Sequence, residues 1–397
     1  MKLIPCYKVF RRFYNTYNYS PLASVTPQIT PTFTPKTTSN LKVNPTENWQ
    51  NVFSSATFDD QWSKLCCEGE KLVHYSTTQF NSKYLDNQEI TNVTLQLKKL
   101  AGTNHPLLKT AKRLMAEGNS ISTSTLVVLL LAKAFGPNSD KLTTNHSNII
   151  RSQCLLAEMI ELINSAYYIH RSVLNLNSYL TGNNGLVVGN KMSILSGDYL
   201  LASVWNGLCE LKNTPVVELM ASSISNLMEG QFIRESESIH DYTVESWEKR
   251  NFKLYGSLMA NSCRSVAVLA NKSSKVQSSA YNFGLNFGLA WQLANEMKPF
   301  LDPFPPTTNN QDNHLFDPNS TPLLMHLLSS QDTFIDTDFT QMNQKQLYHL
   351  IRSGEAIELT REMKNCYALS ALNSLKGLPN NDSFLLLSKF VAILLML

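Results

Sequence analysis

Apolar side chains recur at intervals of three and four residues over most of this chain, from about residue 48 onward. Because an α-helix has 3.6 residues per turn, this spacing gathers apolar side chains on one face of a helix. Gly284 and Gly288 lie beside the longest stripe, where a missing side chain would let a second helix approach closely. The sequence therefore predicts an all-α fold with a packed core. The stripe consists of Val276, Ala280, Phe283, Phe287, Ala290, Ala294 and Met297.

Further helices are predicted along the rest of the chain, about ten or more in all. Leu186–Val188, bracketed by glycines, is the one strand-like piece and reads equally well as a loop. Glu235–Asp241 and the segment 299–322, rich in Pro and Asn, are predicted to be long loops. The additional predicted helices cover 104–117, 122–135, 148–170, 190–211, 215–233, 243–270, 341–352 and 355–375.

The first 46 residues differ from the rest in charge. They contain no acid and six basic residues, which leaves 28 basic and 31 acidic residues for the remainder, a net charge of −3. Their first part is amphipathic, and after Ser20 the segment is rich in Pro and Thr. This pattern indicates a mitochondrial transit peptide and a disordered spacer over residues 1–46; the alternative is a disordered tail that lacks acids by chance. The six basic residues are Lys2, Lys8, Arg11, Arg12, Lys36 and Lys42.

Composition excludes several classes of protein for the remainder. An acidic balance argues against a basic surface for nucleic acid. Seven scattered cysteines without CxxC spacing argue against a disulfide framework or a zinc site. The longest uncharged apolar run, Leu126–Ala132, is far shorter than the roughly 20 residues of a membrane span, although peripheral association with a membrane stays open. Motifs for nucleotide binding, zinc proteases and serine hydrolases are absent.

Three blocks in order resemble the trans-isoprenyl (polyprenyl) diphosphate synthase family. Leu155–Asn175 resembles the helix that leads into the first DDxxD motif, Gly189–Ala202 the GxKxxxLxGDxLL segment, and Gly284–Met297 the helix that leads into the second DDxxD motif. The resemblance runs from about residue 95 to the C-terminus, which leaves 47–94 as an N-terminal extension. It implies a helical bundle around a central cavity, the isoprenoid synthase fold, over residues 95–397.

Both aspartate-rich motifs are degenerate in this chain. The first reads Arg171, Ser172 and Asn175, and the second reads Asn295, Glu296 and Pro299, so one carboxylate remains at six positions. Members of the family use these carboxylates to hold Mg²⁺, which activates the diphosphate leaving group. Arg171 would oppose a divalent ion by about 8 kcal/mol at ~4 Å and an effective dielectric constant of ~20.

Positions that bind isopentenyl diphosphate in the family are altered as well. Gly118–Thr125, which matches the GGKxxRP segment, contains no basic residue, and Leu254-Tyr255 stands where a Lys-Thr pair is expected. Tyr167 and Tyr168 stand just before the first motif, where bulky side chains limit product length in the family; ordinary core packing explains them equally well.

The resemblance therefore implies a non-catalytic subunit of a heteromeric, decaprenyl-type all-trans polyprenyl diphosphate synthase that supplies the ubiquinone side chain. We expect no cofactor on this chain, Mg²⁺ in a catalytic partner subunit, assembly as a heterodimer or heterotetramer, and a location in the mitochondrial matrix. Helices such as 190–211 carry apolar side chains that a monomer would expose. The alternatives are a lone helical binding protein derived from the family and a catalyst with an altered metal site.

Some residues of the family pattern are retained, and each has a structural interpretation beside a functional one. Asp198 would cap or brace a helix, or contact a substrate. His170 would be a core or capping residue. Lys191 and Gln292 are candidate remnants of an ancestral pocket, and Glu158, beside Glu161, is expected to satisfy buried polar groups. No residue is assigned a catalytic role.

Overall fold

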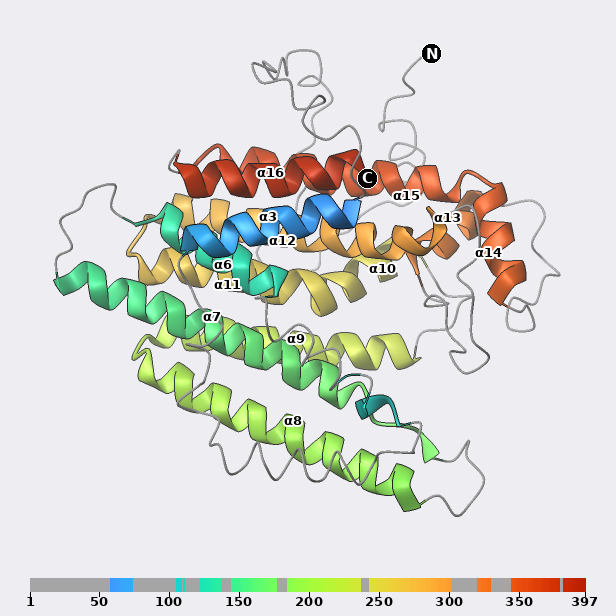
Figure 1. Ribbon diagram of the computed structural model, residues 1–397, viewed down its shortest axis with the longest axis horizontal. Helices are drawn as coiled ribbons and strands as arrows, with labels where there is room; N and C mark the ends of the chain where they lie inside the picture. Colours follow the sequence, from blue (N-terminus) through green and yellow to red (C-terminus); the bar gives the residue numbers. More distant parts are fainter. Residues whose placement is uncertain are drawn as a thin grey trace, which may run out of the picture. The chain divides into compact units, whose positions relative to one another are not determined.

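A computed structural model gives the fold (Figure 1). It describes residues 58–73, 105–108, 110, 122–136, 144–176, 184–236, 243–301, 320–329, 344–378 and 381–397. Every regular element in these ranges is a helix, so the predicted all-α class is confirmed. The predicted transit peptide, 1–46, lies outside the described residues.

Fourteen helical elements follow one another along the described chain. One of them is a π-helical turn, η4, which joins α10 to α11, and another is the 3₁₀ turn η5, which follows α12. The elements are α3 (Phe58–Val73), α6 (Thr123–Ala134), α7 (Thr144–His170), α8 (Asn184–Glu210), α9 (Thr214–Ser236), α10 (Val244–Asn251), η4 (Phe252–Gly256), α11 (Ser257–Leu269), α12 (Ser274–Met297), η5 (Lys298–Phe300), α13 (Thr321–Ser329), α14 (Gln344–Ser353), α15 (Ala356–Leu375) and α16 (Asp382–Met396).

The predicted helices agree with most of these bounds, and the differences have local causes. The strand-like interpretation of Leu186–Val188 is wrong, because this segment forms the first turns of α8. The predicted loop 299–322 begins in η5 and ends inside α13, while 302–319 lies outside the described residues. The C-terminal helix α16 was not predicted. The predicted helix 104–117 and loop Glu235–Asp241 fall largely outside the described ranges.

Helix α12 lies at the centre of the packing, against α11 on one side and α15 on another. A Cβ atom on Gly284 would lie 2.5 Å from the carbonyl oxygen of Met259, and one on Gly288 would lie 2.9 Å from that of Tyr255. Both distances are too short for a side chain, so glycine is required where α12 meets η4 and α11. The close approach predicted from these two glycines is confirmed.

Helix α3, from the N-terminal extension, is docked on the same central helix. The indole of Trp62 on α3 stacks on Trp291 of α12 with ring centroids 4.1 Å apart. Lys298 at the end of α12 places its Nζ 4.8 Å from the Phe58 ring centroid and 2.7 Å from Asp59 Oδ1. Stacking and a cation over an aromatic face therefore fasten this part of the extension to the bundle.

Helix α8 lies along α7 at the lower edge of the bundle in Figure 1. Its outward side exposes several apolar side chains, including Val187 at 55% and Leu195 at 53% of their full surface. The expectation that this helix exposes apolar side chains is therefore confirmed. The other large apolar side chains that α8 exposes are Val188, Ile194 and Trp205.

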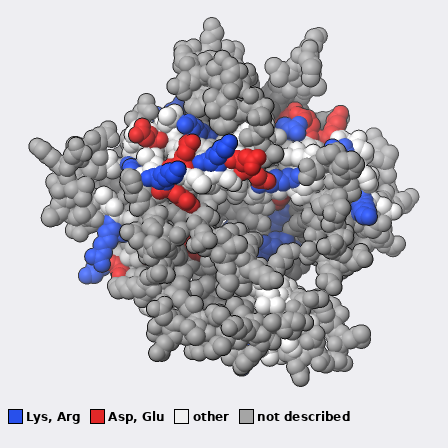
Figure 2. Space-filling view, in the orientation of Figure 1, with Lys and Arg blue, Asp and Glu red and all other residues white. Residues whose placement is uncertain are grey.

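Charges of both signs are interspersed on the described surface. In Figure 2 the Lys and Arg atoms lie beside Asp and Glu atoms. One such pair, Lys389 of α16 and Glu68 of α3, is 3.9 Å apart and joins the two helices. No helix in the described part of the chain is both long and apolar enough to cross a membrane.

Lys364 on α15 is an uncompensated buried cation and generates a stability prediction. Its side chain is fully buried, and its Nζ has no hydrogen-bond partner within the described part of the chain. Burial, assisted by Arg361 and partly opposed by Glu358, lowers the pKa of this ammonium group to about 8. The charged form is therefore disfavoured in the folded state. Lys364→Met should stabilise the protein near pH 7 by about 1–3 kcal/mol.

The pH dependence has a definite sign. Below about pH 8 the folded protein bears the full cost of the charged ammonium, and between that value and the ordinary pKa of lysine the cost disappears as the unfolded chain binds more protons. The stability gap between Lys364→Met and wild type should shrink between pH 7 and pH 10 in urea unfolding. Lys376→Met, at an exposed lysine that ends the same helix, is the control and should change stability little at either pH. A gap that is equal at both values would contradict the assignment.

Candidate functional site

The first degenerate motif lies beyond the end of its helix. α7 ends at His170; Arg171 and Ser172 follow in a turn, and Asn175 lies in irregular backbone. The predicted helix 148–170 also ends at His170, so its predicted C-terminal bound is confirmed. The Ser172 hydroxyl donates to the Ile169 carbonyl at 2.6 Å and lies 2.9 Å from Ser193 Oγ, which ends the helix and buries Ser172 against α8.

Asn190 of α8 holds the backbone that follows this turn. Its Oδ1 accepts from the backbone N–H of Leu174 at 2.8 Å, and its Nδ2 donates to the Leu174 carbonyl at 2.8 Å. The Nε2 of His105 lies 3.0 Å from the same Oδ1. A Cβ atom on Gly189 would lie 2.3 Å from the His105 ring, so the imidazole reaches Asn190 only because residue 189 is glycine. Asn190 of the GxK segment thus holds the backbone at Leu174, within the first motif.

Gly197 and Asp198 of the same segment contact His170, the last residue of α7. A Cβ atom on Gly197 would lie 2.1 Å from the His170 ring. The Nε2 of His170 lies 3.3 Å from Asp198 Oδ1 and 3.4 Å from the Ile194 carbonyl oxygen. Asp198 therefore braces the end of α7 against α8. Lys191, one more retained residue of the segment, is exposed on α8.

The second degenerate motif contains the one surviving carboxylate, and this carboxylate is engaged in a hydrogen-bond network. Asn295 and Glu296 lie at the end of α12, and Pro299 lies in η5. Glu296 Oε2 accepts from the backbone N–H of Thr321 at 2.8 Å and also from the Thr321 hydroxyl. Its Oε1 accepts from Gln292 Nε2 at 2.8 Å.

Thr321 is the first residue of α13, and Trp247 Nε1 donates to its hydroxyl at 2.6 Å. An anion at a helix N-terminus is favourable, because the first backbone N–H groups lack partners within the helix. Glu296 therefore joins α12 to the start of α13. This role accounts for the carboxylate without a metal.

Two tyrosines bring the two motifs into one electrostatic environment. Burial raises the pKa of Tyr167 on α7, while Arg171 and Arg234 lower it. Burial also raises the pKa of Tyr255 in η4, where Tyr167 and Glu296 add to the rise and both arginines oppose it. Arg171 of the first motif and Glu296 of the second thus act on the same buried hydroxyl.

The cluster formed by Tyr167, Arg171, Arg234, Tyr255 and Glu296 differs chemically from a metal site. The Arg171 guanidinium carbon lies 5.7 Å from the Tyr167 ring centroid, and the Tyr167 hydroxyl donates to Gln231 Oε1 at 3.3 Å, which joins α7 to α9. Sequence reasoning singled out four of these residues but missed Arg234 and Gln231. No sequence pattern marks them, because α9 has a weak apolar face and their position depends on the way α9 packs.

The nearest lysine to the expected Lys-Thr position is engaged elsewhere. Lys253 stands directly before Leu254-Tyr255, and its Nζ lies 2.5 Å from Glu229 Oε2 and donates to Asn226 Oδ1 at 3.1 Å. Asn226 in turn donates to Ser257 at 2.8 Å. The π-helical turn η4 falls at this position, where one additional residue per turn changes the direction in which side chains point. Lys253 thus serves the contact between η4 and α9.

Glu158 and Glu161 on α7 lie apart from this cluster. Glu161 Oε2 accepts from the hydroxyls of Ser122 and Thr125 at the start of α6, the latter at 2.6 Å. Burial raises the pKa of Cys154, and the half-buried Glu158 adds to this rise. Glu161 thus satisfies buried polar groups at the start of α6. The same role for Glu158 stays a prediction.

The residues present do not fit Mg²⁺. Mg²⁺ requires hard oxygen ligands in near-octahedral geometry, whereas the positions of the two motifs offer a guanidinium, a buried hydroxyl, amides, a proline and one carboxylate that already accepts three hydrogen bonds. Within the described residues, no group of three or more His, Cys, Asp or Glu side chains could hold a metal ion.

Comparison with known proteins places these features in a family. The model of the family described as Polyprenyl synthetase matches residues 107–301. The chain is 32% identical over 341 residues to the all trans-polyprenyl-diphosphate synthase PDSS2 of Homo sapiens, across 81% of this chain and 84% of that protein. It is 23% identical over 397 residues to a probable mitochondrial hexaprenyl pyrophosphate synthase of Yarrowia lipolytica, across 81% and 86% of the two chains.

Solved structures share the fold. A geranylgeranyl pyrophosphate synthase from Lactobacillus brevis superposes with a TM-score of 0.59 at 18% identity, over 79% of this chain and all of the other. The apo form of a medium/long-chain length prenyl pyrophosphate synthase from Arabidopsis gives a TM-score of 0.56 at 24% identity, over 75% of this chain and 98% of the other. The predicted isoprenoid synthase fold is confirmed.

The network around Glu296 predicts a stability effect. Glu296→Gln keeps the size of the side chain but removes its charge, so the hydrogen bonds to Thr321 lose their charge assistance. We expect a loss of about 1–2 kcal/mol in urea unfolding. Thr321→Val in the Glu296→Gln background should cost less than it does in wild type, because the two residues share one network. Strictly additive losses would show that the carboxylate does not act through Thr321.

Proposed function

Because the chain belongs to the polyprenyl synthetase family, we propose that it is the non-catalytic subunit of a heteromeric all-trans polyprenyl diphosphate synthase. In this proposal an active synthase of the same family holds Mg²⁺ and performs chain elongation, and the product becomes the side chain of ubiquinone. The relatives named PDSS2 and hexaprenyl pyrophosphate synthase support long-chain prenyl chemistry.

The observation that carries the proposal is the commitment of Glu296 to α13. An enzyme that ionises an allylic diphosphate needs several carboxylates free to bind metal on two facing segments. Here the one surviving carboxylate accepts three hydrogen bonds, and Arg171 and Arg234 both act on the tyrosines between the two motifs. The Tyr167–Gln231 hydrogen bond ties α7 to α9 beside the first motif. Both features favour a structural role for this chain over a catalytic one.

The outward side of α8 supplies a surface for the partner. Val187 and Ile194 are seven residues apart, as are Val188 and Leu195, so the exposed apolar side chains form a stripe with the repeat of a helix–helix interface. Exposed apolar stripes of this kind mark association sites. The helices that α8 contacts within the described residues, mainly α7, cover only its inner side.

Two charges within this stripe specify how a second helix would align. Lys191 precedes Ile194 by three residues and Asp198 follows Leu195 by three, and both are exposed. An antiparallel helix with the same pattern, centred on these two apolar residues, would place its aspartate beside Lys191 and its lysine beside Asp198. A synthase that carries its own GxKxxxLxGDxLL segment offers such a helix. We therefore assign the α8 stripe to the corresponding helix of the catalytic subunit.

The proposed location is the mitochondrial matrix. Residues 1–46, basic and free of acids, have the composition of a transit peptide. The Yarrowia lipolytica relative is named as mitochondrial.

Reconstitution tests the division of labour. The full chain alone should form no prenyl diphosphate, and the pair with an active long-chain synthase should form more product than that synthase alone. Replacing a DDxxD aspartate of the partner should abolish activity and leave the complex intact on size exclusion. Arg171→Asp with Asn175→Asp should be tolerated, because both positions are exposed. The double variant should add little activity, because the second motif stays degenerate. Mg²⁺-dependent turnover by this chain alone, or an unchanged product and rate without it, would refute the proposal.

Charge reversal tests the interface. Lys191→Glu should weaken binding of the unmodified synthase by about threefold to tenfold, because an attractive pair becomes repulsive. Asp198 is left in place because it also contacts His170. The corresponding reversal in the synthase should restore binding. Lys345→Glu, at an exposed lysine on α14, is the matched control and should have no effect. If the reversed chain binds both forms of the synthase equally, α8 does not face that helix.

A further inference from the structure

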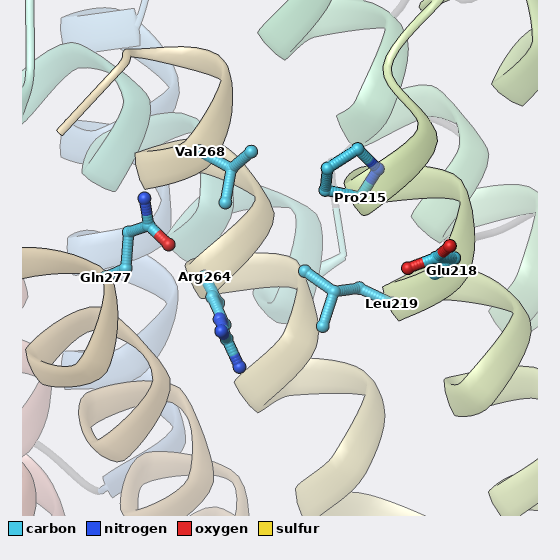
Figure 3. Close-up of a pocket in the computed structure, with 6 residues that line it drawn as sticks. All are labelled: Pro215, Glu218, Leu219, Arg264, Val268 and Gln277. Atoms are coloured by element: carbon cyan, nitrogen blue, oxygen red, sulfur yellow. The ribbon is translucent and has the colours of Figure 1, made fainter. Parts of the chain in front are cut away.

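A cavity of about 350 Å³ opens between α9, α11 and α12 (Figure 3). Three of its lining residues are apolar or nearly so, and the other three are an arginine, a glutamine and a glutamate. Cavities from about 300 Å³ upward accommodate small organic ligands. The lining residues are Pro215, Glu218 and Leu219 of α9, Arg264 and Val268 of α11, and Gln277 of α12.

This cavity is separate from the cluster at the degenerate motifs. Arg264 follows Tyr255 by nine residues along one continuous run of helix, which corresponds to about 13 Å of rise. Gln277 precedes Glu296 by 19 residues on α12, which corresponds to about 28 Å. The cavity therefore belongs to the other end of these helices, and its chemistry is independent of the proposed function.

Arg264 brings an uncommitted cation to the cavity. Its side chain is half-buried, and within the described part of the chain no hydrogen bond or ion pair engages its guanidinium. Glu218 lines another wall but forms no ion pair with it. Burial raises the pKa of Tyr281 on α12, and the charge of Arg264 opposes this rise. A planar guanidinium with free N–H groups is suited to a carboxylate, which it can bind through two hydrogen bonds.

Gln277 presents a fixed polar group to the same space. Its Nε2 donates to the Lys272 carbonyl at 2.9 Å, so its orientation is set and its Oε1 is available as an acceptor. In Figure 3 this amide and the Arg264 side chain lie on the same side of the cavity, while Leu219 and Pro215 come from the helix opposite. The cavity thus combines a cation and an acceptor with an apolar wall.

We propose that this cavity binds a small organic monocarboxylate, with the carboxylate on Arg264 and an apolar body against Leu219 and Val268. Glu218 lines the same cavity and would repel a second negative charge, so the lining favours a monoanion over a dianion such as phosphate. A ligand here would contact α9, α11 and α12 together, and α9 and α12 also carry Arg234 and Glu296 of the cluster at the degenerate motifs. The site would therefore couple occupancy to the packing of the bundle centre.

Binding of phenylacetate to the full chain, measured by saturation-transfer NMR and calorimetry, tests the proposal. Phenylacetate should bind saturably, and its neutral counterpart phenylacetamide should bind at least about tenfold more weakly, because it lacks the charge that Arg264 recognises. Arg264→Gln should weaken phenylacetate binding by at least about tenfold. Lys275→Gln removes an exposed charge at the start of α12 that does not line the cavity, and it should leave binding unchanged.

A second variant keeps the test decisive if Arg264→Gln fails to fold, which circular dichroism would reveal. Leu219→Trp fills the apolar side and leaves the guanidinium in place, and it should abolish binding. The proposal is overturned if phenylacetate does not bind saturably, if the amide binds as well as the acid, or if folded Arg264→Gln or Leu219→Trp binds like wild type.

Discussion

The close approach of α12 to η4 and α11 is the contact on which the rest of this bundle depends. Gly284 and Gly288 present no side chain to the carbonyls of Met259 and Tyr255, so the backbone of α12 packs directly against the backbone of α11 and η4. With α12 held in this position, its stripe of buried side chains faces α15 as well. The same contact fixes the position of the C-terminal end of α12. It therefore also fixes Glu296 and Lys298, the lysine that contacts α3.

The charged groups at that end are used for construction. Glu296 joins α12 to α13, Lys298 lies over aromatic rings of α3 and α12, and Lys253 ties η4 to α9. Each would be costly to bury alone and is stable because it has a partner. Charged groups that an enzyme would leave free to bind metal and diphosphate thus form contacts between helices here. This agrees with the absence of aspartates from the two motifs.

Sequence reasoning predicted what depends on periodicity and on local pattern. The stripe of α12, the bounds of α9 and α15 and the role of Gly284 follow from spacing alone, and the degenerate motifs can be read directly. The predicted helix 148–170 also ends where α7 ends, at His170. The Ser172 hydroxyl and the Asn190 amide hydrogen-bond to the backbone of Ile169 and Leu174 at this point. Arg234 and Gln231 could not be found, because their positions relative to Tyr167 depend on the packing of α9 in the bundle, chiefly against α11 and η4.

Helix α8 shows why a segment of a catalytic family persists in a chain with degenerate motifs. On its inner side Gly189, Gly197 and Gly207 admit the side chains of His105, His170 and Met159, each closer than any Cβ atom would allow. On its outer side Lys191 and Asp198 lie among exposed apolar residues. A substitution on the inner side would separate α8 from α7, and one on the outer side would alter the surface offered to a partner. Neither requirement involves a metal, so both hold after the carboxylates have gone.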